Sequence, residues 1–355
     1  MPSRFSLALW STPWRWTGLI GSGLCLVILF ELLHFPAALL LGPMLAAIVF
    51  GMSGASVRVP RPAFLAAQGI VGMMMAASIP LDLVTELRND WPVFISGILF
   101  TVLASAVLGY FMTRAKLFPG TTAIWGSSPG AAAAMVLMSE AHGADMRLVA
   151  FMQYLRVACC ALISTILART MGLDPTAQGS VDWFPPMDWA AVALTVALGV
   201  GSAFAAPRLR IPGGGLLLAL MIGLGMKVMG LPLVLPPLLL AVSYAVIGFV
   251  VGLRFTREVV RHAARAFPRT LASILTLIGV CAGFGYGLHL VTGVDLLTAF
   301  LATSPGGADT VAIIASSPDM NIDVPFVMTM QVGRFLFVVL TAPALARYLS
   351  AGARA

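Results

Sequence analysis

Two pairs of polar side chains stand inside otherwise apolar segments: Gln153 with Arg156, and Gln331 with Arg334. Residues three apart on a helix share a face, so each amide would lie beside a guanidinium group. Each arginine lies about ten residues into its segment, where a charge is costly in a membrane and normally faces a cavity or a partner. We therefore predict an anion site in which the arginines supply charge and the glutamines orient the ligand.

A Ser-Pro-Gly element precedes each pair: Ser128, Pro129 and Gly130 in one place, and Ser304, Pro305 and Gly306 in the other. Serine is a favoured N-cap and proline fits the first helical position, so each element predicts a helix start. Inside a membrane such a start would present free N–H groups and a positive dipole end to an anion. The alternative is a pair of tight turns that cap short helices at the membrane edge.

Asp309 follows the second element and has Ala133 at the matching position of the first. A buried carboxylate is a candidate coupling group for H⁺ or Na⁺. Alternatively, Asp309 pairs permanently with Arg334, and each arginine serves to neutralise a buried acid such as Asp309 or Glu140. The stretch with Glu140, His142 and Asp145 predicts a solvated loop.

The sequence shows no cluster of residues suited to metal binding or catalysis. The histidines and cysteines are scattered, which predicts no metal site and no cofactor: His34, His142, His262, His289, Cys25, Cys159, Cys160 and Cys281. No activated nucleophile or catalytic dyad indicates an enzyme. The sequence has no helix-turn-helix, basic arm or zinc module, so direct binding of nucleic acid is not expected.

The elements that would position these residues occur twice. Seven residues recur 176 positions later, namely Pro36, Gly72, Pro92, Tyr110, Ser128, Pro129 and Gly130, while the Gln-x-x-Arg pair recurs at 178. One shared offset over so long a span indicates two homologous halves. We predict a first membrane repeat over 1–173, an extracytoplasmic linker over 174–186 and a second membrane repeat over 187–355.

Composition identifies a polytopic membrane protein, because 59% of the 355 residues are hydrophobic and only 10% are charged. At about 20 residues per crossing, the apolar segments predict ten spans: 17–34, 36–53, 62–80, 92–113, 147–170, 187–206, 212–230, 236–253, 268–290 and 324–346. Gly126 to Glu140 and its copy Ala302 to Ser316 would be re-entrant or broken helices. Small residues four apart, Gly72 with Ala76 and Gly248 with Gly252, predict close helix packing.

The distribution of basic residues orients these spans. The loop after the third span carries Asp82, Glu86, Arg88 and Asp90, whereas its copy carries Arg254, Arg257, Glu258, Arg261, Arg265 and Arg269. Arginine-rich loops stay in the cytoplasm, so equivalent loops face opposite sides. The fold prediction is all-α: about ten transmembrane helices in two inverted five-helix repeats, multi-pass in the cytoplasmic (inner) membrane, with both termini cytoplasmic.

At the Ser-Pro-Gly and Gln-x-x-Arg positions the chain resembles the AbrB-type membrane family, a duplicated apolar module with these two motifs in each half. Ala131 replaces a second glycine in the first half, and Gly42-Pro43 has no counterpart at Leu218-Ala219. Members carry labels of ammonia monooxygenase, regulator of gene expression or transporter, and the absence of clustered metal ligands argues against the first.

The leading functional prediction is a secondary transporter of a small, anionic solute that works by alternating access of the two halves. Its partners would be the solute, a coupling H⁺ or Na⁺ and the lipid bilayer, with a homo-oligomer left open. The alternative is a membrane-embedded regulator of gene expression that acts through a partner protein.

Overall fold

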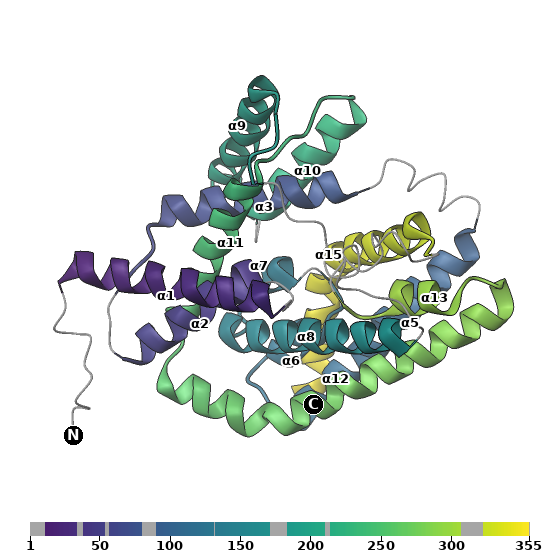
Figure 1. Ribbon diagram of the computed structural model, residues 1–355. Helices are drawn as coiled ribbons and strands as arrows, with labels where there is room; N and C mark the ends of the chain where they lie inside the picture. The colour runs from purple at the N-terminus through teal and green to yellow at the C-terminus, as the bar shows by residue number, and fades with distance from the viewer. Residues whose placement is uncertain are drawn as a thin grey trace. The chain divides into compact units, whose positions relative to one another are not determined.

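The computed structural model describes residues 11–33, 38–53, 57–79, 90–130, 132–170, 183–209, 214–306 and 322–354 (Figure 1). Within these ranges every regular element is a helix, and no strand occurs. The prediction of an all-α chain is confirmed for this part of the molecule.

The first half of the chain contains α1 (Thr12–Leu32), α2 (Ala38–Met52), α3 (Arg61–Ser78), α5 (Trp91–Arg114), α6 (Thr122–Ser127), α7 (Ala132–Ala141) and α8 (Met146–Thr170). The second half contains α9 (Trp189–Ala205), α10 (Gly214–Val228), α11 (Pro237–Gly252), α12 (Arg257–Thr292), α13 (Leu296–Thr303) and α15 (Val324–Arg354). Every predicted span overlaps one of the longer helices. Helices α2 and α10 begin 176 positions apart, and α8 and α15 begin 178 apart.

Within the described ranges, four helical segments are long and apolar enough to cross a bilayer: Thr12–Leu32, Trp91–Arg114, Met146–Ser164 and Arg257–Thr292. Five shorter apolar helical segments of 10–17 residues accompany them, from Ala38–Met52 to Pro325–Thr341. Such helices suggest a membrane protein.

The chain forms two compact units that cut across the predicted repeats. The first unit combines Met1–Ser78 with Ser180–His262, and the second combines Ile79–Gly179 with Ala263–Ala355. Each unit therefore draws one segment from each half of the sequence.

In the first unit, α3 packs against α9, α10 and α11, while α2 packs against α1 and α11. Backbones approach closely at these crossings: a Cβ on Gly72 would lie 2.8 Å from Ala219 Cβ, and one on Gly248 would lie 3.1 Å from Met44 N. The close packing predicted from the small residues is confirmed at both crossings.

The second unit contains the short helices. Helix α6 packs against α5, α7, α8 and α15, and α13 packs against α5, α8 and α15. Each short helix thus contacts long helices from both halves of the sequence. All six residues of α6 and the seven residues from Leu297 to Thr303 of α13 are buried.

Candidate functional site

Each Ser-Pro-Gly element ends a short helix. Ser128 follows α6 with φ −58° and ψ 126°, and Ser304 follows α13 with φ −54° and ψ 131°. A residue before proline is disfavoured in the α conformation, so Pro129 and Pro305 stop the helices there. The prediction that Ser128 starts a helix is wrong, because Ser128 is the C-cap of α6 and α7 begins only at Ala132. Ser304 is likewise the C-cap of α13, and the stretch 307–321, where the second predicted helix would run, lies outside the described residues.

In the first half the element lies between α6 and α7. The Ser128 hydroxyl donates to Ile124 O (2.7 Å), and Gly130 N donates to Ser128 O (3.0 Å). In the second half, Gly306 N donates to the Ser304 hydroxyl (3.4 Å). These N–H groups are bonded within the elements, and the predicted ligand contacts of the elements remain a prediction.

The two prolines create an unpaired carbonyl that the two glutamines satisfy. In a continuing helix, Trp125 O and Leu301 O would accept from the N–H four residues later, but those residues are Pro129 and Pro305. Gln153 Nε2 donates to Trp125 O at 2.8 Å instead. The same bond joins Gln331 Nε2 to Leu301 O at 2.6 Å. Each glutamine therefore supplies, from a neighbouring helix, the donor that the proline removes.

The two arginines bind the same helix ends. Arg156 Nη1 donates to Ser127 O (3.1 Å) and Ser128 O (2.9 Å), and its Nη2 donates to Gln153 Oε1 (2.6 Å). In the other half, Arg334 Nη1 donates to Ser304 O (2.8 Å). Its Nη2 donates to Gly306 O (3.3 Å) and to Gln331 Oε1. The contacts of each Gln-x-x-Arg pair are nearly the same.

Both guanidinium groups are fully buried charges. Arg156 is 1% and Arg334 is 2% exposed, and Nε of each has no hydrogen-bond partner among the described residues. Within that part of the chain no carboxylate contacts either group. The carbonyls of a helix C-terminus carry partial negative charge, which offsets part of each positive charge. Asp309, the predicted coupling residue, lies outside the described residues.

The two assemblies lie close together within the second unit. A Cβ on Gly306 would lie 3.2 Å from Cys160 Cβ, and Cys160 is one turn beyond Arg156 on α8. Cys160 and Cys281 are also buried. Among the described residues, no three His, Cys, Asp or Glu side chains gather where they could hold a metal ion. The chemistry of this site is that of cationic hydrogen-bond donors.

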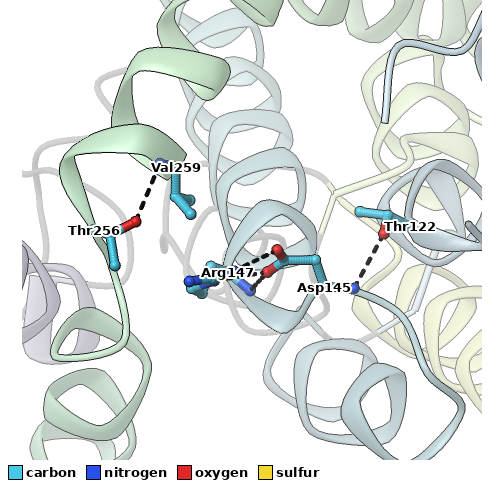
Figure 2. Close-up of polar contacts among 5 residues, drawn as sticks. All are labelled: Thr122, Asp145, Arg147, Thr256 and Val259. Carbon is cyan, nitrogen blue, oxygen red and sulfur yellow. Dashed lines mark hydrogen bonds and ion pairs between the residues drawn. The ribbon is translucent and has the colours of Figure 1, made fainter. Parts of the chain in front are cut away.

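A second contact fixes the start of each Gln-x-x-Arg helix to the short helix. Asp145 N donates to Thr122 Oγ1 at 3.1 Å (Figure 2), and Asp323 N donates to Thr298 Oγ1 at 3.3 Å. The Asp145 carboxylate caps α8 and binds Arg147 at 2.7 Å. Each short helix is therefore tied to its partner helix near both of its ends.

Glycines on the long helices make room for the short ones. A Cβ on Gly109 of α5 would lie 3.2 Å from Ile124 Cα. A Cβ on Gly285 of α12 would lie 3.1 Å from Ala299 O. Contacts this short to backbone atoms exclude any larger residue without movement of the helices.

The sequence singled out Gln153, Arg156, Gln331 and Arg334, and all four contact the Ser-Pro-Gly elements. Their predicted role in binding an anion stays a prediction. The sequence prediction missed the aspartate and threonine contacts at the helix starts, and it treated Asp145 as part of a solvated loop. The signal was present, because Asp145 and Asp323 each stand just before the helix that carries the pair, as N-caps do.

Comparison with known proteins identifies the family of this chain. The profile of the family described as "Transition state regulatory protein AbrB" matches residues 39–350. A protein of Escherichia coli (strain K12) named "Putative regulator AbrB" is 43% identical over 95% of this chain and 97% of its own length. "Uncharacterized protein YhjN" of Bacillus subtilis (strain 168) is 25% identical over 79% of this chain and 77% of its own length. The chain belongs to the AbrB family.

Proposed function

We propose that this protein is a secondary transporter of a small anionic solute, and that Arg156 and Arg334 bind the solute. The observation that carries the proposal is the pair of fully buried guanidinium groups at the ends of two short helices, with Nε of each unpaired among the described residues. Charged side chains inside membrane segments usually mark the path of a substrate or ion.

A charge estimate supports an anionic ligand. Two guanidinium groups carry a charge of +2, and two helix C-termini offset at most about −0.5 each, leaving about +1. A bound anion would neutralise this remainder at a site shielded from water. Ser128, Pro129, Gly130, Ser304, Pro305 and Gly306 would shape the site, Gln153 and Gln331 would orient the arginines, and Asp309 would carry a coupling H⁺ or Na⁺.

The proposed architecture is two inverted repeats of five crossings, each with a broken helix, in the cytoplasmic membrane and with both termini cytoplasmic. Support comes from paired contacts: α3 packs on α10, and α11 packs on α2, which is the same pairing with the two halves exchanged. Inverted repeats with broken helices at their interface suit alternating access. A short helix that contacts both halves, as α6 and α13 do, would sense their relative movement.

A binding assay tests the anion proposal. Detergent-purified protein would be heated with a panel of carboxylates, sulfonates, phosphates, amines and neutral solutes, because a ligand of the native state raises Tm. We expect at least one class of anion to stabilise the wild type but neither Arg156→Met nor Arg334→Met. Arg208→Met removes an exposed arginine and is the matched control. Stabilisation by amines or neutral solutes alone would reject the proposal.

The name of the Escherichia coli relative, "Putative regulator AbrB", favours a second candidate, a membrane-embedded regulator of gene expression that acts through a partner protein. This function requires a stoichiometric partner, so the protein would be captured from cross-linked membranes and its companions quantified. A companion at one copy per chain would favour the regulator over the transporter.

A further inference from the structure

The first part of α12 carries a row of basic side chains that the anion site does not use. Arg257, Arg261, Arg265 and Arg269 are spaced four residues apart and are all exposed. The stretch from Arg257 to Arg269 contains a single acidic residue, Glu258. We call these four arginines the basic stripe.

The opposite face of this segment is bound to the protein. Ala263, Ala266 and Thr270 are buried, with Ala263 and Ala266 each 6% exposed. Phe267 reaches Phe151 of α8, with 6.4 Å between the ring centroids. The buried residues of this segment are small, and the ring of Phe267 lies beside them while staying partly exposed. The basic stripe lies on the other side of the helix.

The length of α12 places the basic stripe outside the hydrocarbon core. At about 1.5 Å per residue, the 36 residues of the helix extend well beyond the core thickness of about 30 Å. The stretch from Thr270 to Leu290 contains no Asp, Glu, Lys or Arg and is long enough to span by itself. Pro268 lies inside α12, two residues before that stretch, and a proline inside a helix is a position where helices bend.

The start of the helix is well fixed. The Thr256 hydroxyl accepts a hydrogen bond from Val259 N (3.4 Å, Figure 2), which caps the first turn. Arg257 Nε donates to Met52 O (3.1 Å). Arg261, Arg265 and Arg269 make no ion pair with the described residues. Three of the four guanidinium groups are therefore available to an outside partner.

We propose that the basic stripe binds the phosphate headgroups of anionic lipids at the membrane surface. One guanidinium group can donate two parallel hydrogen bonds to two oxygens of the same phosphate. A basic, amphipathic segment next to a membrane span is attracted to anionic lipid, with an affinity gain of about fivefold for each arginine near the surface. This surface is separate from the Arg156 and Arg334 site, so the proposal does not depend on the transport function.

The test is a binding titration of the full-length protein, purified in a neutral detergent, with short-chain phosphatidylglycerol or phosphatidylcholine. Arg261→Gln with Arg265→Gln should weaken phosphatidylglycerol binding about 25-fold, given about fivefold per arginine. Arg261→Lys with Arg265→Lys should keep most of the affinity. Arg114→Gln with Arg208→Gln, which removes two exposed arginines at other helix ends, should change it less than threefold.

Several results would overturn the proposal. One is equal affinity of the wild type for the two lipids; another is an equal loss in the control double variant. If glycerol phosphate or a short DNA duplex competed as well as phosphatidylglycerol, the partner would be a soluble anion or a nucleic acid instead. All variants change exposed side chains, and an unchanged Tm would show that each is folded.

Discussion

The sharpest prediction concerns the hydrogen bond from Gln153 to Trp125 O, the carbonyl that Pro129 leaves without a backbone donor. Gln153→Met is nearly isosteric but removes two bonds to carbonyls and one from Arg156. Ser128 O keeps two donors, Arg156 Nη1 and Gly130 N. Trp125 O loses the donor that Gln153 supplied, and a buried carbonyl without a partner costs about 1–3 kcal/mol.

Including the lost bond to Arg156, we expect Gln153→Met to lower the free energy of unfolding by about 2–4 kcal/mol. In a Pro129→Ala background the backbone gains an N–H at position 129. That N–H can donate to Trp125 O if the helix continues by one residue. The glutamine substitution should then cost about 1–2 kcal/mol less than it does alone.

The assay is a double-mutant cycle on reversible unfolding in mixed micelles titrated with dodecyl sulfate. Gln68→Met with Pro129→Ala is the control cycle, because Gln68 is a buried glutamine of the other compact unit and should show additive effects. Additivity of the Gln153 and Pro129 substitutions within about 0.5 kcal/mol would refute the reasoning. Gln331→Met with Pro305→Ala should reproduce the coupling.

Two further predictions concern packing and acid stability. Gly285→Leu should lower the free energy of unfolding by about 1–3 kcal/mol, because its side chain meets Ala299 O; Gly283→Leu, with no atom within 4 Å, should be neutral, and equal costs would contradict this. Burial alone would raise the pKa of Asp145, but hydrogen bonds and charge from Arg147 lower it below 3.8 overall. A lowered folded pKa gives stability that is present above the unfolded value and lost as pH falls through the folded one. Thermal melts below about pH 4 should therefore show a steeper loss in the wild type than in Asp145→Asn, and parallel losses would argue against this ion pair.

Much of the fold could be predicted from hydrophobic segments and one offset. The offset of 176 positions that relates Pro36 to Pro212 in the sequence also relates the first residues of α2 and α10. Helix α12 exceeded its predicted range because charge, rather than helix propensity, set the expected boundary. Its first turns are helical but amphipathic, and a search for apolar spans excludes them.

The sequence singled out the residues that meet at the ends of α6 and α13, but it mistook their local geometry, and their role in ligand binding stays a prediction. Ser128 and Pro129 suit an N-cap and a first helical position, yet the same dipeptide also ends a helix, since the residue before proline avoids the α conformation. The sequence after the dipeptide is rich in alanine and favours a helix start. The preceding α6 is only six residues long, which is too short for a helical period of apolar residues to be recognised in the sequence. The glutamine contact to Trp125 O is a tertiary bond that no local pattern could reveal.

Solute uptake into proteoliposomes tests the central claim most directly. The anion that most stabilises the purified protein would be supplied outside vesicles containing the wild type, Arg156→Met, Arg334→Met or the exposed control Arg208→Met. We expect saturable uptake by the wild type and the control, and background uptake by either buried-arginine variant once equal amounts of folded protein are shown. Near-normal uptake by both folded variants would contradict the claim.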